Sequence, residues 1–95
     1  MAVYRLSKSA DIKLDQIYEY SLLTFGERQA DLYYHSLHDA FEKLANMPFL
    51  GRPFRGRRRH QHAEHVIFYR SIADGILILQ IFHHAEDIER RLDPK

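Results

Sequence analysis

The chain has 95 residues, of which 45% are hydrophobic and 28% are charged, and its formal net charge is +1. This length and composition predict a single globular domain over residues 1–95 and exclude a disordered chain. The absence of cysteine excludes disulfides and cysteine-based zinc sites, and it is compatible with a reducing cytoplasm. The sequence begins with no signal-peptide pattern, and its longest apolar run, residues 76–79, is far too short to span a bilayer. We therefore expect a cytoplasmic protein without a membrane contact.

The first half of the chain predicts a short strand followed by two helices. Residues 3–6 are typical of a strand, and Ser7 or Ser9 can cap a helix that continues to about residue 25. Gly26 marks a tight turn, and a second helix over residues 27–46 is ended by Pro48. The expected buried positions are Ala10, Leu14, Ile17, Tyr18 and Leu22 in the first helix, and Ala30, Tyr33, Tyr34, Leu37, Ala40, Phe41, Leu44 and Ala45 in the second. We also expect Tyr20 to pack inside the fold.

The second half predicts strands. Glycine and proline punctuate residues 47–56, which we interpret as an irregular connector. Residues 57–62 are interpreted as a polar strand, and residues 65–72 and 76–83 as a hairpin turning at residues 73–75. Residues 85–92 can form a short helix. The order β-α-α-β-β-β-α predicts an α+β fold, in which a helical hairpin packs on one face of a small, mainly antiparallel sheet.

Positive charge is concentrated in residues 51–62, GRPFRGRRRHQH, which contain five arginines. Residues 1–51 carry a net charge of −2 and residues 52–95 a net charge of +3. Such a cluster can bind carboxylates or phosphates through forked guanidinium groups, or it can be a solvated edge strand that resists aggregation. We favour partner binding for part of it. Direct nucleic-acid binding is not expected, because the chain as a whole is nearly neutral.

The last predicted strand is apolar on both of its faces. Strict alternation places Leu77, Leu79 and Ile81 on one face, and Ile76, Ile78 and Phe82 on the other. A helical hairpin covers one face only. Two interpretations follow: the second face is an exposed apolar surface for a partner, or the strand is central and fully covered.

Histidines follow the arginine cluster and close the last strand. His60, His62 and His65 belong to the first group, and His83 and His84 to the second. Imidazole is a common metal ligand, but no HExxH motif or paired spacing is present, so no metal site and no cofactor are expected. Histidine beside arginine could also serve acid–base chemistry on RNA.

Several segments resemble the ParE toxins of the RelE/ParE superfamily of bacterial toxin–antitoxin modules. They are YRLSKSA, QIYEYSLLTFGERQADLYYHSL, FEKLANMPFLGRPFRG, HVIFYR and ILILQIFHHAEDI, and together they extend from Tyr4 to about Leu92. The resemblance implies a type II toxin that inhibits DNA gyrase and is not itself an enzyme. It also implies neutralisation by a ParD-like antitoxin, whose acidic and apolar C-terminal segment folds around the toxin. The expected antitoxin- or target-binding residues are Arg52, Arg55, Arg57, Arg58, Arg59, Ile76, Ile78 and Phe82.

The same superfamily suggests an alternative, because RelE relatives cleave mRNA in the ribosome. In that case the catalytic residues would be Arg58, Arg70, His83 and His84. The chain departs from that pattern, since no tyrosine follows His83 and no lysine occurs between residues 52 and 93. A third hypothesis is an inert relative that is retained as a folding partner.

Overall fold

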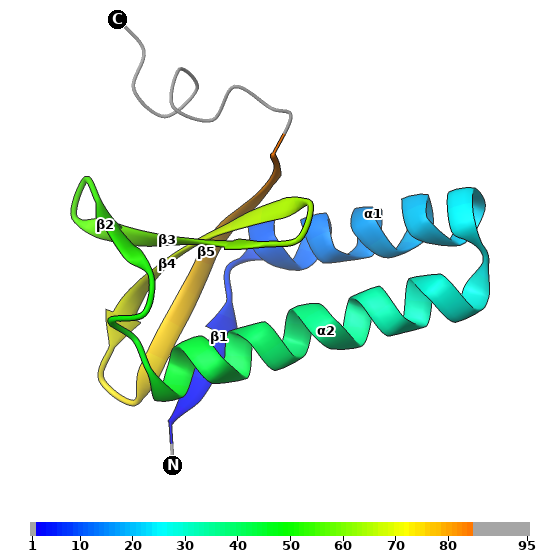
Figure 1. Cartoon of the computed structure of the whole chain (residues 1–95). Coiled ribbons are helices and arrows are strands. Elements are labelled where there is room, and N and C mark those ends of the chain that lie inside the picture. Colours follow the sequence, from blue (N-terminus) through cyan, green and yellow to red (C-terminus); the bar gives the residue numbers. More distant parts are fainter. Residues whose placement is uncertain (1, 85–95) are drawn as a thin grey trace, which may run out of the picture.

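The computed structural model of the chain describes residues 2–84, which form two helices on a five-stranded sheet (Figure 1). The helices are α1 (Lys8–Phe25) and α2 (Glu27–Asn46); the strands are β1 (Val3–Leu6), β2 (Arg52–Phe54), β3 (Arg57–His62), β4 (His65–Ile72) and β5 (Gly75–His83). The strand order is β1-β5-β4-β3-β2, with β1 parallel to β5 and the other pairs antiparallel. The predicted α+β fold with a helical hairpin and a mainly antiparallel sheet is confirmed. The helix expected over residues 85–92 lies outside the described residues.

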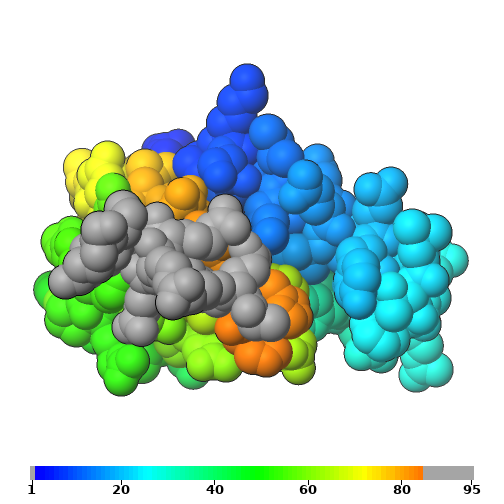
Figure 2. Space-filling view, turned by 90° about the horizontal axis from the view of Figure 1, so that it is seen from above, coloured from blue at the N-terminus to red at the C-terminus, as the bar shows by residue number. Residues whose placement is uncertain are grey.

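The helical hairpin has the predicted bounds. The Ser7 hydroxyl oxygen accepts the Ala10 backbone N–H at 3.0 Å and so caps α1. Gly26 has a φ of 92°, a conformation that favours glycine, and its N–H bonds to the Leu22 carbonyl at 3.1 Å. Figure 1 shows the turn between the helices standing clear of the sheet, and Figure 2 shows the same end, in cyan, extending sideways from the body of the molecule. Neither described helix is long and apolar enough to cross a membrane.

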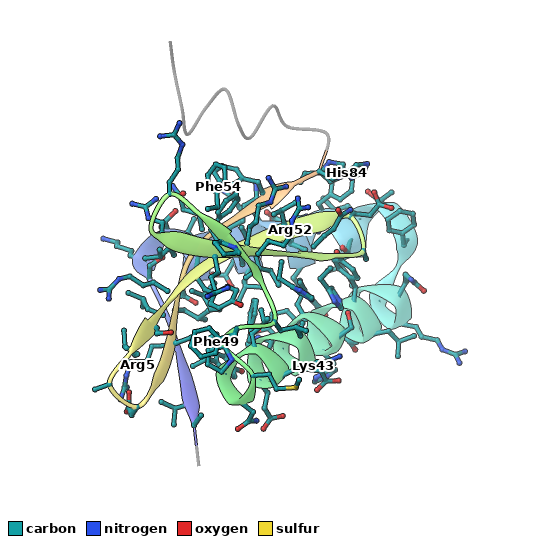
Figure 3. The ribbon with its side chains drawn as sticks, turned by 60° about the vertical axis from the view of Figure 1, so that its left-hand side comes forward. Arg5, Lys43, Phe49, Arg52, Phe54 and His84 are labelled. Carbon is teal, nitrogen blue, oxygen red and sulfur yellow. The ribbon has the colours of Figure 1, made fainter. Side chains whose placement is uncertain are left out.

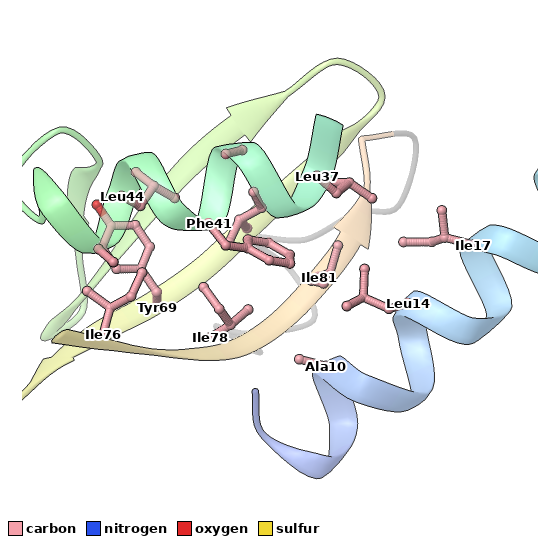
Figure 4. Packing of buried hydrophobic residues seen from close by; sticks show 13 residues of the cluster. Ala10, Leu14, Ile17, Leu37, Phe41, Leu44, Tyr69, Ile76, Ile78 and Ile81 are labelled. Carbon is pink, nitrogen blue, oxygen red and sulfur yellow. The ribbon is translucent and has the colours of Figure 1, made fainter. Parts of the chain in front are cut away.

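The main core lies between the helical hairpin and one face of the sheet (Figure 4). Leu14 of α1, Phe41 of α2 and Ile78 of β5 are each at most 1% exposed there. Six of the eight positions predicted to be buried in α2 are buried, whereas Tyr33 and Tyr34 are only partly buried. In α1 the prediction holds for Ala10, Leu14 and Ile17, but Tyr18 is only partly buried and Leu22 is wrong. Leu22 is 39% exposed and Ser21 is buried in its place, because the last turns of α1 lie beyond the sheet.

The predicted irregular connector contains an additional strand, β2. It pairs with β3 at the edge of the sheet, where Pro53 is tolerated because one side of the strand needs no ladder hydrogen bond. Arg55 and Gly56 join the two strands with φ angles of 52° and 78°, the left-handed pair of a tight two-residue hairpin. The sheet therefore has one more strand than the sequence predicted, and the arginine cluster forms a hairpin.

A bulge in β5 overturns the predicted faces of that strand. Phe68 is paired with Gln80 and Tyr69 with Ile78, so Leu79 is an extra residue in the ladder. The alternation of side chains is shifted after it. Ile76 and Ile78 consequently share the helix-facing side with Ile81, and Phe82 points to the opposite face with Val66 and Phe68.

Candidate partner-binding surface

Three arginines and a phenylalanine share the face of the sheet opposite the helices, and we call them the arginine face: Arg52, Phe54, Arg57 and Arg59. The register places Arg52 directly opposite Arg59, and Phe54 opposite Arg57. Like charges in directly opposed positions are destabilising in a sheet. Figure 3 shows Arg52 and Phe54 on the β2–β3 hairpin. A concentration of positive charge held in this way is suited to carboxylates, which would relieve the repulsion.

The arginine face rests on aromatic rings. The Arg59 guanidinium carbon lies 5.8 Å from the centroid of Phe54 and 5.7 Å from that of Phe68. Arg55, in the turn, is 6.0 Å from Phe54. These distances allow cation–π attraction and orient the planar guanidinium groups. Below them Phe68 and Phe82 form a small second core with Val66.

Arg58 does not belong to the arginine face. It pairs with Tyr69, so its side chain points to the other side of the sheet from Arg59, as the alternation predicts. Its Nη1 donates a hydrogen bond to the Gly51 carbonyl at 2.8 Å, and its guanidinium carbon lies 4.8 Å from the Phe49 ring centroid. Figure 3 shows Phe49 well away from Phe54. Arg58 therefore anchors the chain that leads into β2.

An open groove of about 760 Å³ lies between the far half of the helical hairpin and the β3–β4 turn. Its helical side carries apolar side chains that are largely exposed, with Tyr20 at 65% and Phe25 at 63%. Its other side is polar and belongs to the sheet. We call it the hairpin groove, and its lining residues are Lys13, Gln16, Ile17, Tyr20, Ser21, Phe25, Gln29, Tyr33, Ala63, Glu64, His65 and His83.

Hydrogen bonds from α2 hold the polar wall of the hairpin groove in place. The Tyr33 hydroxyl and His65 Nδ1 are 2.6 Å apart, and the Ser36 hydroxyl and His62 Nε2 are 3.0 Å apart. Burial raises the pKa of Tyr33 and lowers the pKa of His62. Both side chains are therefore neutral at pH 7, and they position the β3–β4 turn against α2 without adding charge.

The residues of the alternative RNA-cleaving site do not converge. Arg70 is paired with Leu77, whereas His83 is paired with His65, which precedes Arg70 by five residues in β4. At about 3.3 Å per residue this separates Arg70 from His83 by roughly 16 Å along the sheet. Arg58 and Arg70 also point to opposite faces. His83 and His84 do lie together, with ring centroids 4.7 Å apart, and both face Glu64. The four residues thus form no common phosphate site.

Three of the expected binding residues are buried. Ile76 and Ile78 face the helices and are 0% exposed, and the bulge that follows them brings Ile81 to the same side. Phe82 is only 8% exposed, so the sheet does not present the open apolar patch that the sequence suggested. Most of the exposed large apolar side chains of the described residues lie on the helical hairpin instead, and Met47, Phe49 and Leu50 lie in the connector that follows it. Tyr20, expected inside the fold, is among the exposed side chains of the hairpin, and the helical spacing of the sequence carried no signal of its exposure.

Five strands in this order beneath an antiparallel helical hairpin define a protein of the RelE/ParE-like fold. A solved structure of the chromosomal ParDE toxin–antitoxin system of P. aeruginosa superposes with a TM-score of 0.76 at 21% identity, covering 87% of this chain and 96% of that one. The family model of the ParE toxin of the type II toxin–antitoxin system parDE matches residues 4–88, and the chain belongs to this family.

Two curated relatives have similar lengths. Toxin ParE1 of Caulobacter vibrioides is 33% identical over 96 residues, covering 97% of this chain and 99% of the relative. Toxin ParE1 of Mycobacterium tuberculosis is 29% identical over 94 residues, covering 94% and 96%. The alignment of nearly the whole chain with both toxins agrees with the fold, and the chain is a ParE toxin of a ParDE toxin–antitoxin system.

Proposed function

We propose that this toxin is neutralised by a ParD-like antitoxin that binds the hairpin groove and the arginine face, and that the free toxin inhibits DNA gyrase in the cytoplasm. The observation that carries the first half is the coexistence of exposed apolar side chains in the groove with the opposed arginines of the sheet. An acidic amphipathic segment fits this combination, since its apolar side would cover the groove and its carboxylates would meet the guanidinium groups.

A second depression connects the two parts of this surface. It has a volume of about 520 Å³ between α1 and β5, and it shares Lys13 and Gln16 with the hairpin groove. At its other end it reaches Phe82, which packs beneath the arginine face. One extended segment of the antitoxin can therefore follow α1 from the groove toward the arginines, passing Lys13 on the way.

The groove half of the proposal is tested by a matched pair of variants in α1. Tyr20→Ala removes a side chain that lines the groove, whereas Leu23→Ala removes one that is 82% exposed and lies outside it. We expect Tyr20→Ala to weaken antitoxin binding by at least about tenfold, as aromatic anchors do, and Leu23→Ala to have little effect. The ligand is a ParD-like antitoxin, to be sought as the product of an adjoining gene, and calorimetry measures the affinity. Equal affinities of the two variants would contradict binding in the groove.

The proposed role of the arginine face is tested by removing positive charges from it. The double variant Arg52→Ala with Arg57→Ala is expected to slow association with the antitoxin and to flatten its dependence on salt concentration. Arg28→Ala, at an exposed position of α2, is the control, because it removes a positive charge from the other part of the molecule. Stopped-flow measurements at several salt concentrations would compare the association rates of the double variant and of the Arg28→Ala control. An unchanged salt dependence in the double variant would exclude the arginine face from the interface.

Inhibition of gyrase is supported by the family likeness rather than by a feature of the surface. The test adds the purified toxin to a supercoiling reaction, with and without the antitoxin. We expect supercoiling to stop, or cleaved DNA to accumulate, and the antitoxin to restore the reaction. Unchanged supercoiling together with normal growth of cells that express the toxin alone would instead support an inert relative.

A further inference from the structure

We propose that Glu64, His83 and His84 form a binding site for a divalent transition-metal ion of the Zn²⁺ class. One potential ligand atom from each residue lies within 4.8 Å of the other two. Glu64 Oε1 is 3.1 Å from His84 Nδ1 and 3.9 Å from His83 Nε2, so one carboxylate oxygen faces both imidazoles, whose ring centroids are 4.7 Å apart. Two imidazoles and one carboxylate are a ligand set that Zn²⁺ accepts, with a fourth position left for water or another donor.

The backbone fixes this arrangement from two sides. The His84 backbone N–H donates to the Glu64 carbonyl at 2.8 Å, which ties the end of β5 to the β3–β4 turn. The turn contains Ala63 at a φ of 51°, a left-handed conformation that is strained for a residue with a Cβ. Figure 2 shows the end of β5, in orange, beside the yellow-green turn. Glu64 is thereby held opposite two neighbouring histidines that follow it by about twenty positions in the sequence.

The spacing of the three side chains is close to that of a metal site. Ligands about 2.0–2.2 Å from a tetrahedral ion lie roughly 3.4 Å from one another. The two distances from Glu64 bracket this value, and all three side chains are partly exposed, at 44%, 49% and 64% for His83, His84 and Glu64. A small rotation about exposed bonds completes the set without moving the core. His83 and Glu64 also line the hairpin groove, which places the ion at its rim.

The test titrates Zn²⁺ alone into the full chain, purified without a histidine tag, and follows binding by calorimetry. We expect one ion per chain. Because even outer-shell changes cost metal sites 10- to 100-fold, the ligand variants Glu64→Gln and His84→Ala should each lose at least about tenfold in affinity. His35→Ala is the matched control, since His35 is exposed on α2 and takes no part in the cluster. Parent affinity in His84→Ala and Glu64→Gln, or equal loss in His35→Ala, would overturn the proposal.

A second measurement does not depend on the folding of the variants. In the parent chain, Zn²⁺ should shift or broaden the imidazole NMR signals of His83 and His84 and leave those of His35 unchanged. A chain whose His83 and His84 signals do not respond to Zn²⁺ has no such site, whatever the variants show. Neither measurement involves toxicity or the antitoxin. A negative result would therefore disprove the metal site without affecting the proposed toxin function.

Discussion

The Tyr69 hydroxyl links the sheet to the segment that leads into the arginine hairpin, and its removal gives the sharpest test of the fold. Tyr69 is 0% exposed in β4. Its oxygen accepts the Gly51 backbone N–H at 2.9 Å, and its hydrogen is donated to the Pro48 carbonyl at 2.9 Å. Tyr69→Phe keeps the ring and deletes both bonds. The effect can therefore be assigned to the hydroxyl group rather than to a loss of packing.

The magnitude follows from the two backbone groups left behind. The Gly51 N–H is buried and would lose its acceptor, which costs about 1–3 kcal/mol. The Pro48 carbonyl is partly exposed and can turn to water, so it adds little. For a domain of this size 1 kcal/mol corresponds to about 4–8 °C, and we expect the melting temperature to fall by roughly 5–20 °C. Circular dichroism or calorimetry measures the shift.

Tyr18→Phe is the matched control for this experiment. The Tyr18 hydroxyl donates to the Asp31 carboxylate at 2.7 Å, but the bond is exposed and water can replace it. We therefore expect the melting temperature to stay nearly unchanged. If Tyr69→Phe destabilised the protein no more than Tyr18→Phe, the Gly51 segment would not depend on this hydroxyl, and the account of how β2 is anchored would be refuted.

Three further predictions concern other parts of the fold. Ser7→Ala removes the cap of α1 and a 2.7 Å bond to the Leu79 carbonyl, and it should cost about 1–2 kcal/mol in urea unfolding, whereas Ser9→Ala should not. Gly75→Ala would place a Cβ against the Val3 carbonyl oxygen and 2.7–2.8 Å from the Val3 carbonyl carbon and nitrogen, so amide exchange in β1 should accelerate, and unchanged protection would contradict the close approach. The free energy of unfolding should also fall as the pH is lowered from 7.5 to 5, because burial lowers the pKa values of His38, His60 and His62. The unfolded chain then takes up protons first, below about pH 6.5, and is favoured over the folded chain. A urea midpoint that stays constant over this range would refute the effect of these histidines.

The helices could be predicted from the sequence because local signals fix their ends. Ser7 can cap, Gly26 can adopt the positive φ of the turn, and Pro48 cannot continue α2. The strand β2 could not be predicted in the same way. It has three residues, contains Pro53 and lies between glycines, so its composition is that of a loop, and only pairing with β3 makes it a strand.

The hairpin groove could not be predicted either, because it depends on tertiary placement. The helical spacing of Tyr20 predicts that it packs inside the fold, and Phe25 is the last residue of α1. They are exposed because the helical hairpin is longer than the sheet it covers, and a helical period carries no information about that length (Figure 1). The site therefore lies where one element extends beyond its neighbour, and it becomes visible only when both are placed.

The bulge at Leu79 explains how the single strand β5 contributes side chains to both faces of the sheet and to the hairpin groove. Without the extra residue, strict alternation would turn Ile81 and His83 away from the helices and put Phe82 beneath them. With it, Ile81 completes the main core, Phe82 supports the arginine face, and His83 lines the groove beside Glu64. The Ser7 hydroxyl donates to the Leu79 carbonyl, so the residue that caps α1 also holds the bulge. The contact between Ser7 and the bulge therefore fixes both the start of α1 and the side of the sheet to which His83 points. Because α1 and His83 both line the hairpin groove, this contact also fixes the shape of the groove.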